Sequence, residues 1–594
     1  MKNVRFLLIS CMVISATFTM AQTEGELTNV LPDGVEANIN PERKQDKAKN
    51  LVVAGSPEKG YVAFFAAADA EHGEELWVTD GTPEGTHIVK DIVPGTAGSN
   101  PSHLGRLNDK VLFSAYTDET GQELWVSDGT EDGTFLLADT YIVGDGNPKA
   151  FTQMDESHAI FAATDDESAE YDPDRGPQQW LWITDGTVEG TRRVKAVDVR
   201  WPGQDNTTLH TAYARVGRRV FFKADNVDGT TGEELWVTDG TAEGTHLVMD
   251  INWERYGEGQ PGYDEGWTRN SAIDELKNYK NEMVFFRAWT PDFGQEPWAS
   301  DGLDIDAVNG PGGEGTEHTY LICDTRTDKD ENGIGRGGEV FGAGFEVYKD
   351  RFWFRAWRED GGFEFGGTNL QKGDFKYFDI WDEEPSIDHN SYSDPGCVFD
   401  GVYMFCAAHG FDQAREDNYG GELWYTDGET VKMQMDLVPG TGCDWVKEQT
   451  VAGGSLYWWN EVEAAPLGAY TGALYRLDSK ESTPVVVTHL DPAGDFCHSL
   501  RNMGGLLVFT SDATKKVYAY RYTKPGWDGV TDMGYLEPDF LTESEKEAIS
   551  TIDADPVPAR GIYTPYGVCV RQNGDVRQLE HGFYIVAGKK VIVK

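Results

Sequence analysis

The feature that most restricts how this chain can fold is a short sequence that returns at intervals of about fifty residues. The string Glu-Leu-Trp-Val-Thr-Asp-Gly-Thr at 75–82 recurs, with small changes, around Trp125, Trp182, Trp236, Trp298 and Trp424. From Trp77 onward the tryptophans are 48, 57, 54 and 62 residues apart, and the last step is 126 residues. That last step corresponds to two periods with a degenerate copy near 363–365. Periods of this length are typical of solenoids, propellers or arrays.

Each repeat contains four short apolar or alternating segments, which predict four β-strands. In the second repeat these segments are Ser102–Leu107, Val111–Ala115, Glu123–Ser127 and Phe135–Ala138. Asn-Asp and Asp-Gly turns separate them, and such turns between alternating segments are hairpin signals. A repeated four-stranded antiparallel sheet is the blade of a β-propeller. The sequence therefore predicts an all-β propeller.

The number of blades follows from counting the second strand of each repeat. Nine such strands lie between Tyr61 and Thr510, which predicts eight or nine blades within residues 50–522. The ninth repeat has no clear fourth strand of its own. The segment Gly25–Leu31, inside the N-terminal stretch 22–49, is a candidate for that strand and would close the ring. Propellers usually have four to eight blades, so both numbers stay open.

The recurring string Glu-Leu-Trp-x-Thr/Ser-Asp-Gly-Thr-x-x-Gly-Thr resembles the repeat of large secreted bacterial proteins, called hyalin-like or ELWxxDGT-repeat proteins, over residues 50–440. The resemblance implies an exported repeat protein and assigns no catalytic role. Features present in every repeat are expected to be scaffold. Asp and Thr bond neighbouring backbone in turns, Gly supplies turn freedom, and the tryptophan is expected to pack between blades.

Both ends of the chain indicate export. Residues 1–21 have two cationic residues, an apolar run and a small residue at Ala21, which is typical of a secretion signal peptide. Residues 560–594 end in Gly-Phe-Tyr-Ile-Val-x-Gly-Lys-Lys-Val-x-Val-Lys, which resembles the C-terminal sorting domain of type IX secretion. The resemblance implies the type IX apparatus as an export partner and an extracellular or outer-membrane surface location after passage through the periplasm. A small terminal β-element docked on the propeller is the alternative.

Residues 523–559 are expected to form a linker with a short helix, because Thr542 is followed three residues later by Glu545 in a capping box. No second apolar span predicts a membrane crossing. The formal net charge of −50 argues against nucleic acid or an anionic membrane surface as a partner. Six cysteines follow the signal, without zinc-type spacing. Cys397 and Cys406 flank a predicted hairpin, where either a disulfide or two buried free thiols would fit.

Insertions between the repeats predict which face binds a ligand. In a propeller, second-to-third-strand loops and blade-to-blade loops leave one face, and third-to-fourth-strand turns leave the other. The Asp-Gly-Thr turns are short and nearly constant, apart from an insertion at Leu303–Gly313. Loops on rigid scaffolds carry function, so the opposite face is the predicted binding face, with harmless length variation as the alternative. Its longer segments are expected at 165–178, 252–270, 325–341, 358–372, 409–419 and 461–469.

Aromatic residues in or beside these segments are candidates for a ligand platform. Aromatic faces beside carboxylates suit a sugar, whereas the alternative is that the same rings fix long loops in place. The candidates are Trp253, Tyr256, Tyr263, Trp267, Trp357 and Phe363.

The segment 328–339 matches the twelve-residue calcium-loop pattern D-x-[DN]-x-[DN]-G-x5-E. Calcium takes several oxygens around a sharp turn that Gly permits, closed by a bidentate Glu. The alternative is an acidic, Gly-rich surface loop. The predicted ligands are Asp328, Asp330, Asn332, the Ile334 carbonyl and Glu339.

The sequence contains no nucleophile elbow, zinc-protease, phosphate-loop or dinucleotide motif. We therefore expect an exported, non-catalytic binding protein that presents a glycan-binding or protein-binding face on a propeller. One alternative is a secreted glycan-active hydrolase or lyase with its carboxylates on the insertion-bearing face. A structural surface or adhesion component is the other.

Overall fold

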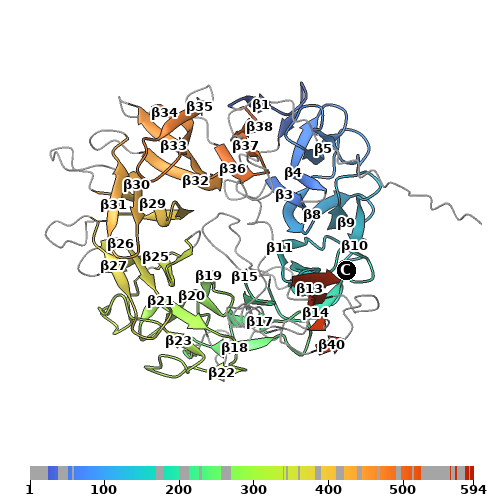
Figure 1. The fold of residues 1–594 in the computed structure, drawn as a ribbon. Coiled ribbons are helices and arrows are strands. Elements are labelled where there is room, and N and C mark those ends of the chain that lie inside the picture. The colour runs from blue at the N-terminus through green and yellow to red at the C-terminus, as the bar shows by residue number, and fades with distance from the viewer. Residues whose placement is uncertain are drawn as a thin grey trace, which may run out of the picture.

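The computed structural model is a ring of nine blades, each built on a four-stranded sheet (Figure 1). The number of blades is thus the larger of the two that the repeats allowed. The described residues contain no helix. The structure describes residues 25–37, 51–56, 59–168, 178–199, 213–226, 231–255, 269–338, 340–342, 345–358, 362–380, 390–409, 421–437, 444–464, 469–489, 497–511, 514–522, 562–563, 569–571, 582–586 and 589–593.

Within blades one to eight the strands follow one another in chain order across the sheet, and in blade nine the fourth strand is the N-terminal β1. Blades one to three are β3 (Leu51–Ser56), β4 (Gly60–Asp69), β5 (Gly73–Thr79) and β6 (His87–Ile88); β7 (Ser102–Leu107), β8 (Lys110–Thr117), β9 (Gly121–Ser127) and β10 (Phe135–Ala138); β11 (Lys149–Gln153), β12 (Ala159–Ala163), β13 (Trp180–Thr184) and β14 (Arg192–Lys195). Blades four to six are β15 (Tyr213–Val216), β16 (Arg219–Ala224), β17 (Glu234–Thr238) and β18 (His246–Asp250); β19 (Asp274–Tyr279), β20 (Met283–Thr290), β21 (Gly294–Ser300) and β23 (Thr319–Leu321); β24 (Val347–Tyr348), β25 (Arg351–Arg358), β26 (Gly362–Thr368) and β27 (Lys376–Phe378). Blades seven to nine are β28 (Asp394–Phe399), β29 (Val402–Ala408), β30 (Gly421–Thr426) and β31 (Val431–Met435); β32 (Asp444–Ala452), β33 (Ser455–Ala464), β34 (Ala469–Leu477) and β35 (Val485–His489); β36 (Cys497–Asn502), β37 (Leu506–Ser511), β38 (Lys516–Arg521) and β1 (Leu27–Asn29).

The ninth blade is completed by the N-terminal strand β1, which lies inside the segment 25–31 that the sequence offered for this purpose. It pairs antiparallel with β38, with Leu27 opposite Tyr520. The chain then crosses to blade one, where β2 (Glu36–Ala37) pairs with β4. Val30, Leu31 and Val35 on the crossing segment are buried in a cluster that spans blades nine and one. Strand pairing and apolar packing therefore close the ring together.

In the Asp-Gly-Thr turn, the recurring residues are joined by hydrogen bonds or packed closely against one another. In blade two, Asp128 Oδ1 accepts bonds from Thr130 N at 3.0 Å and Thr130 Oγ1 at 2.7 Å. Thr130 Oγ1 in turn accepts from Gly133 N at 3.0 Å. A Cβ on Gly133 would lie 2.0 Å from Asp128 Oδ1, so only Gly fits. The later Thr134 hydroxyl lies 2.8 Å from that of Ser127. The motif is therefore structural.

The glutamate that opens the motif is buried and anchors the loop that leads to the next blade. Glu123 is fully buried and accepts bonds from Thr140 N and Gly146 N, both at 2.7 Å. These contacts satisfy backbone N–H groups that the crossing loop would otherwise bury without a partner. Glutamates at the same position anchor the loops of five further blades, and they are Glu75, Glu234, Glu296, Glu364 and Glu422.

The motif tryptophans pack between neighbouring blades, as expected. Trp125 lies in one cluster with Phe64 and Val78 of blade one. Trp236 and Trp424 lie likewise against the blades that precede theirs. Because each tryptophan fills the space between two sheets, the period of the sequence is also the period of the packed core.

Blade six departs from this pattern, and one sequence expectation fails there. The segment 358–372 is not an insertion, because it contains the hairpin turn and the third strand β26. The degenerate copy near 363–365 is that strand, with Glu364 in the anchoring position. Gly366 stands where the tryptophan is expected, and the Phe375 ring packs where a Cβ would be. The degenerate copy expected near 363–365 is thus confirmed, whereas the overlapping insertion expected at 358–372 is wrong, because no tryptophan marks the third strand of this blade.

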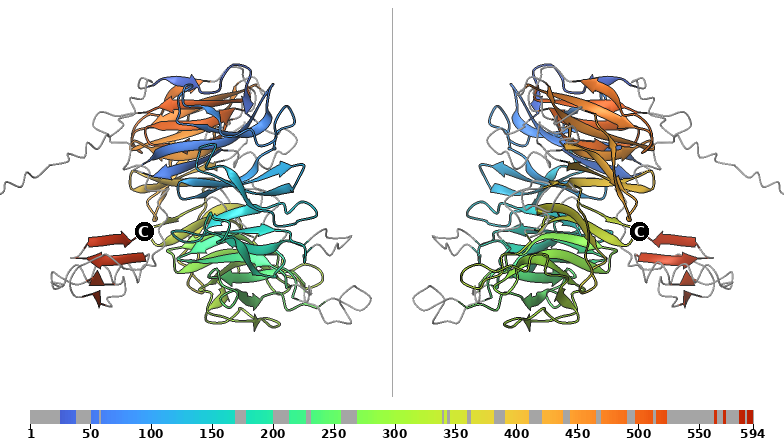
Figure 2. Two further views of the ribbon diagram at one scale, coloured as in Figure 1. Left: turned by 90° about the vertical axis from the view of Figure 1, so that its right-hand side faces the viewer. Right: turned by 90° about the vertical axis from the view of Figure 1, so that its left-hand side faces the viewer.

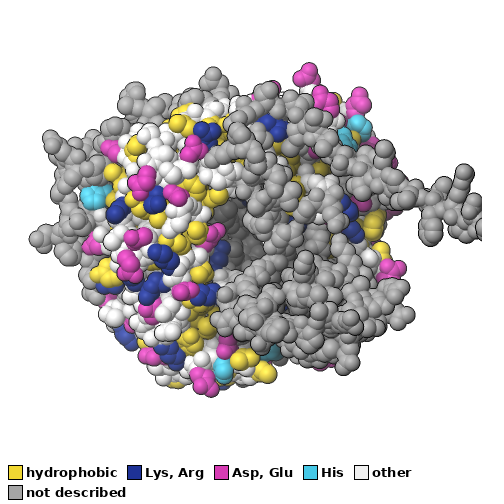
Figure 3. All heavy atoms as spheres, viewed as in Figure 1, with side chains coloured by type: hydrophobic (Ala, Val, Ile, Leu, Met, Phe, Trp, Pro, Cys, Tyr) yellow, Lys and Arg dark blue, Asp and Glu magenta, His cyan; other side chains and the backbone are white. Residues whose placement is uncertain are grey.

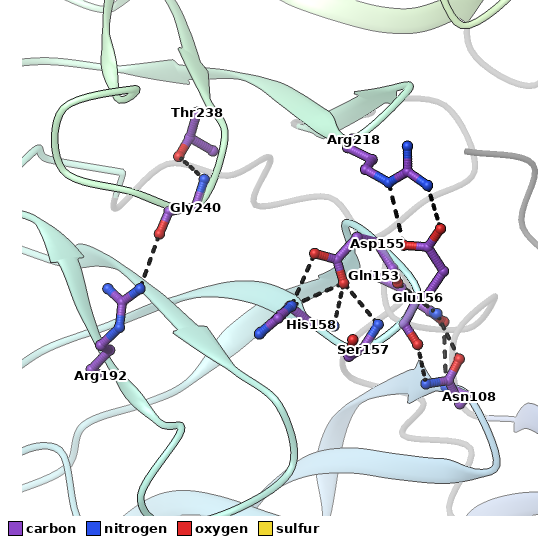
Figure 4. A network of polar contacts seen from close by, with 10 residues as sticks. All are labelled: Asn108, Gln153, Asp155, Glu156, Ser157, His158, Arg192, Arg218, Thr238 and Gly240. Carbon is purple, nitrogen blue, oxygen red and sulfur yellow. Dashed lines mark hydrogen bonds and ion pairs between the residues drawn. The ribbon is translucent and has the colours of Figure 1, made fainter. Parts of the chain in front are cut away.

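Blade-to-blade hydrogen bonds join the turns on the Asp-Gly-Thr side of the ring (Figure 4). Asn108 of the β7–β8 turn donates from Nδ2 to Glu156 O at 2.9 Å, and Glu156 pairs with Arg218 of blade four. Farther out, Arg192 donates to Gly240 O in the next Asp-Gly-Thr turn at 3.3 Å. The insertion at 303–313 leaves from this side but does not stay there: it forms β22 (Ala307–Val308), which pairs in parallel with β18, and Gly312 N donates to Asp292 Oδ2 at 2.6 Å in the β20–β21 hairpin on the opposite side. Turns of consecutive blades are thus directly bonded.

A separate four-stranded sheet near the C-terminus consists of β39 (Ile562–Tyr563), β40 (Cys569–Arg571), β41 (Gly582–Val586) and β42 (Lys589–Val593) (Figure 2). The predicted signal peptide at 1–21 and the predicted linker helix in 523–559 lie outside the described residues. Among the described residues, no helix is long and apolar enough to span a membrane. Cys397 and Cys406 are not joined in a disulfide: Cys397 lies opposite Met404 and Cys406 lies opposite Asp394, so the register does not bring the two cysteines together.

Candidate ligand-binding rim

The side opposite the Asp-Gly-Thr turns is the loop face, made of the second-to-third-strand hairpins and the blade-to-blade loops. The two kinds of loop meet there, as Asn100 N donates to Glu74 O at 3.1 Å beside the hairpin of blade one. Each anchoring glutamate fixes only one or two points of its blade-to-blade loop. The remainder of each loop is therefore able to vary without disturbing the sheets.

The predicted calcium loop lies along the seam between blades five and six. Gly335 N donates to Pro291 O at 3.0 Å, and Gly338 N donates to Gln295 O at 3.2 Å, both in the β20–β21 hairpin. On the other side, Trp357 N donates to Gly338 O at 2.6 Å. The segment therefore joins two hairpins.

The predicted calcium ligands have protein partners in this arrangement. Asp328 pairs with Arg326 and, at 3.5 Å, with Arg336, and the Arg326 bond lowers the pKa of Asp328. Asp330 Oδ1 accepts from Asn332 N at 2.8 Å and from Ile334 N at 2.9 Å. The Ile334 carbonyl accepts from Asp330 N.

Glu339, the predicted closing ligand, lies outside the described residues. Among the residues that are described, no three His, Cys, Asp or Glu side chains are grouped to hold a metal. A calcium ion at Asp328 requires this carboxylate to exchange its two arginine partners for the ion. The calcium site therefore remains a prediction.

The structure brings two of the predicted aromatic residues together with this loop. Trp357 and Phe363 are cross-strand partners in the β25–β26 hairpin. The Arg326 guanidinium, held by Asp328, lies 3.6 Å from the Trp357 ring centroid, which is a cation–π contact. One face of Trp357 is thus covered by the loop that it helps to fix. Trp253 is half-buried in the connection after blade four, and Tyr256, Tyr263 and Trp267 lie outside the described residues.

Next to this hairpin is a stack of alternating guanidinium and aromatic groups from blades five to seven, which we call the arginine–aromatic ladder. It consists of Arg287, Phe341, Arg355, Phe363 and Tyr392. The two guanidiniums lie 5.4 and 4.7 Å from the Phe341 centroid. Arg355 is also 5.7 Å from the Phe363 centroid, and Phe363 stacks with Tyr392 at 6.2 Å. Three blades therefore contribute to one array.

The two arginines are held by carboxylates. Arg287 Nη2 lies 3.1 Å from Asp274 Oδ2, and Arg355 Nη1 lies 3.5 Å from Asp394 Oδ1. Burial lowers the pKa of Arg355, and the charge of Asp394 opposes this effect. In both arginines, the Nε–H group is buried without a hydrogen-bond partner among the described residues. Arg287 Nη1 also donates to Val340 O at 3.0 Å and Arg355 Nη1 donates to Ser393 O at 3.2 Å, so both side chains are fixed by the surrounding loops.

Tyr392 is the exposed end of the ladder. Its side chain is 41% exposed, and its backbone has a φ of 43°. The same left-handed conformation recurs two residues before the first strand of other blades, at Asn100, Asn147 and Ala272, so it belongs to the scaffold. The exposed Tyr392 ring is therefore the most accessible surface that the ladder offers.

Sequence reasoning missed the ladder because the arginines lie in strands and not in loops. The signal was present as a Phe-Arg-Ala-Trp string at 286–289 that returns at 354–357. In blades four to six the residue after the second-strand Phe is basic, whereas the other blades have small or uncharged residues there. The basic residues are Lys223, Arg287 and Arg355; the others are Ala66, Ser114, Ala162, Cys406, Trp459 (after Trp458 in place of Phe) and Thr510.

Neither a family model nor a curated protein matches the chain. Solved structures show distant similarity. Puromycin hydrolase, as an S511A mutant, aligns at 13% identity and a TM-score of 0.32 over 70% of this chain and 58% of its own. The Niastella koreensis GH74 enzyme aligns at 12% identity and 0.25 over 82% and 62%. The β-propeller domain of the Trilobed protease from Pyrococcus furiosus aligns at 10% identity and 0.29 over 64% and 96%. Similarity at this level carries no argument about activity.

Proposed function

We propose that the protein is an exported, non-catalytic binding protein that holds a glycan against the arginine–aromatic ladder on the loop face. One observation carries the proposal: three consecutive blades have a basic residue at a half-buried second-strand position where the other six have an uncharged residue, and in blade six this residue, Arg355, contacts the Phe363 ring that stacks with the exposed Tyr392. Residues that recur in all blades belong to the scaffold. A site is unique, so a localised departure from the repeat is where binding is expected. Stacked aromatic rings suit the apolar face of a sugar.

The contacts of the buried carboxylates favour binding over catalysis. Burial raises the pKa of Glu296 and of Glu364 to about 8, a value that would suit a general acid. Both carboxylates, however, accept bonds from backbone N–H groups of blade-to-blade loops. Their environment is that of an anchor. A secreted hydrolase or lyase remains the second candidate and is an outcome of the test below.

Titration of the mature protein with soluble polysaccharides tests the proposal. Tyr392→Ala is expected to weaken glycan binding about tenfold, because one stacked aromatic contact is lost. The matched control is Tyr116→Ala, since Tyr116 is also exposed and ends the second strand of blade two on the same face. Equal losses in the two variants contradict a site at the ladder.

Other results of the same titration identify the alternatives. Sugar release that a single Asp or Glu substitution abolishes indicates the enzyme. Absence of glycan binding together with self-association indicates a structural or adhesion component, and absence of both leaves a protein ligand for this face.

We further propose that the tail at 560–594 directs surface display through the type IX apparatus. The support is its closing string Gly-Phe-Tyr-Ile-Val-x-Gly-Lys-Lys-Val-x-Val-Lys. Removal of these residues is expected to leave the protein in the periplasm. Fractionation of cells checks this, and normal surface delivery of the truncated protein contradicts it.

A further inference from the structure

We propose that the outer wall of blade four is a docking surface for an extended segment of a partner protein, and that this segment carries both aliphatic and basic side chains. The surface is formed by the insertion 303–313, which the other Asp-Gly-Thr turns lack. It lies on the outer circumference of the ring, at β22 in Figure 1, and does not involve the arginine–aromatic ladder. The inference therefore does not depend on the proposed glycan site.

Three aliphatic side chains of this insertion are exposed to solvent. Leu303, Ile305 and Val308 are 61%, 68% and 69% exposed. Among the described residues, no other stretch of six contains three large apolar side chains that are exposed. In Figure 3, hydrophobic side chains lie at the lower margin of the molecule, where Figure 1 places β22, with acidic side chains close by. Exposed apolar groups that lie together and are bordered by polar residues are typical of interaction sites.

The insertion is fixed in this conformation along its length. At its base, Leu303 N donates to Asp301 Oδ1 at 2.9 Å. In its middle, Asp306 N and Asn309 N each donate to a carbonyl group of β18 at 2.9 Å. Between these two bonds, Ala307 packs against the core cluster that blades four and five share. Ala307 thus occupies the inward position, and the three larger aliphatic side chains are held outward by an ordered segment.

The strand β22 also offers its backbone to a partner. It is the outermost strand of a five-stranded sheet, so one of its edges has no strand beside it among the described residues. An exposed strand edge accepts an extended segment of another chain through main-chain hydrogen bonds, and the neighbouring side chains supply specificity. The docked segment is therefore expected to be extended and to pair along β22.

The charge around the apolar side chains selects the partner. Residues 301–317 contain five acidic residues and no Lys or Arg. Asp306 and Glu314 are exposed beside the aliphatic side chains. Arg219 of blade four lies at the base of the insertion, where the charge of Asp301 opposes its own. Charges interact over about 8 Å at physiological salt, so a basic side chain next to this surface would be attracted.

Other occupants fit this surface less well. A second copy of the chain, paired edge to edge through β22, would bring the same acidic residues together. An anionic membrane surface or a nucleic acid would be repelled by them as well. A neutral apolar segment would cover the aliphatic side chains but would leave the carboxylates without a counter-charge. A segment with both aliphatic and basic side chains matches both properties of the surface.

The experiment measures binding of a labelled synthetic peptide of alternating lysine and valine to the mature protein, by fluorescence anisotropy. The triple variant Leu303→Ser, Ile305→Ser, Val308→Ser is expected to bind at least about tenfold more weakly than the native protein, because the apolar contact is lost. The matched control is Ile142→Ser with Val143→Ser, whose side chains are 71% and 78% exposed on the loop after blade two. This control should bind like the native protein. All five side chains are exposed, so both variants are expected to fold, which circular dichroism checks.

Two further comparisons separate charge from strand pairing. Asp306→Asn combined with Glu314→Gln is expected to weaken binding about fivefold, the size of a surface ion pair, and added salt should have less effect on this variant. A peptide with glutamate in place of lysine should not bind. A lysine–valine peptide that is N-methylated at every residue cannot donate main-chain hydrogen bonds and should lose binding about tenfold or more.

Each of the other results contradicts part or all of the proposal. Equal binding by the native protein and the triple variant overturns it, and so does equal binding of the glutamate peptide. Equal binding of the methylated peptide overturns the pairing along β22. Self-association that the triple variant abolishes, without peptide binding, overturns the basic partner and assigns a second copy to this surface. Absence of both peptide binding and self-association overturns a docking surface on this wall, and none of these results bears on the glycan site.

Discussion

The two sides of the ring are held together by different means, although the same strands reach both. On the Asp-Gly-Thr side, turns of consecutive blades bond to one another directly, for example Lys90 Nζ to Thr134 O at 2.7 Å and Lys376 Nζ to Gly428 O at 2.8 Å. On the loop face, a buried glutamate fixes the crossing loop of six blades at a few backbone N–H groups. The Asp-Gly-Thr side is therefore constrained at nearly every residue. On the loop face, the crossing loops can vary in sequence and length between the residues that the glutamates bind. For that reason a binding site is expected on the loop face.

The largest effect is expected from a change that disrupts both sides at once. Deletion of residues 22–37 removes β1 and the crossing to blade one, where Val30, Leu31 and Val35 are buried. Burial of three such side chains is worth on the order of 5 kcal/mol, against a total of about 5–15 kcal/mol for a folded protein. We expect loss of cooperative thermal unfolding, measured by circular dichroism. A peptide of residues 22–37 added in trans should restore it, and an unchanged melting temperature in the truncated chain would show that the ring does not need this strand.

A change confined to the loop face should cost less. Glu123→Ala leaves Thr140 N and Gly146 N buried without an acceptor, at about 1–3 kcal/mol each. Urea unfolding should show a loss of that order. Asp128→Ala, in the turn on the other side of the same blade, is the control: it removes exposed contacts and is expected to cost less. If Asp128→Ala lowers the free energy of unfolding more than Glu123→Ala does, the expected order of the two sides is wrong.

The same glutamates predict how stability depends on pH. Burial raises the pKa of Glu123 to about 7, and those of Glu296 and Glu364 to about 8, from an ordinary 4.5. Because the folded state holds these protons more tightly, their contribution is full below pH 4.5 and is lost as pH rises to about 8. The free energy of unfolding should fall across that window by up to about 1.4 kcal/mol per pH unit for each group. Glu123→Gln should flatten the slope measured by urea unfolding from pH 5 to 9, and an unchanged slope would assign it to other groups.

The smallest effect is expected at the predicted calcium loop. With a Kd of about 10⁻⁴–10⁻³ M, 1 mM calcium would stabilise the fold by about 0.4–1.4 kcal/mol. Displacement of Arg326 and Arg336 from Asp328 would reduce the gain. Calorimetric melting with and without calcium measures it, and the Asp328→Ala, Asp330→Ala double variant should lose the shift. An equal shift in both proteins places the ion elsewhere, and no shift in either indicates an acidic surface loop.

The sequence predicted the architecture well because the architecture is periodic. All nine second strands lie where the repeat placed them, and β1 lies within the expected closing segment. The ambiguity in blade number came from blades eight and nine, where Tyr475 and Tyr518 replace the tryptophan. Packing tolerates this exchange, since Tyr475 stacks on Trp458. Blade six was misassigned for the same reason, with Gly366 and Phe375 sharing the volume of one tryptophan.

The candidate site was predicted only in part. Trp357 and Phe363 were predicted because they are aromatic and lie near long loops. These two properties do not indicate that arginines stack beside them. That stack depends on distances between Phe341, Arg287 and Arg355, which belong to different blades and are far apart in the sequence. The calcium pattern records the spacing of oxygens along one segment. It does not record that Arg326, outside the pattern, pairs with Asp328.

Closure by β1 also has a consequence for the order of events when the protein is made. Leu27 is among the earliest described residues to emerge and Tyr520, its partner, follows 493 positions later. Until both are present, β38 has an unpaired edge, and open strand edges recruit other chains. The entropic cost of joining such distant ends grows only slowly with length, but the contact cannot form before synthesis is nearly complete. The newly made chain therefore passes through a long interval as an incomplete ring, and this interval is when a chaperone or an export machine would encounter it.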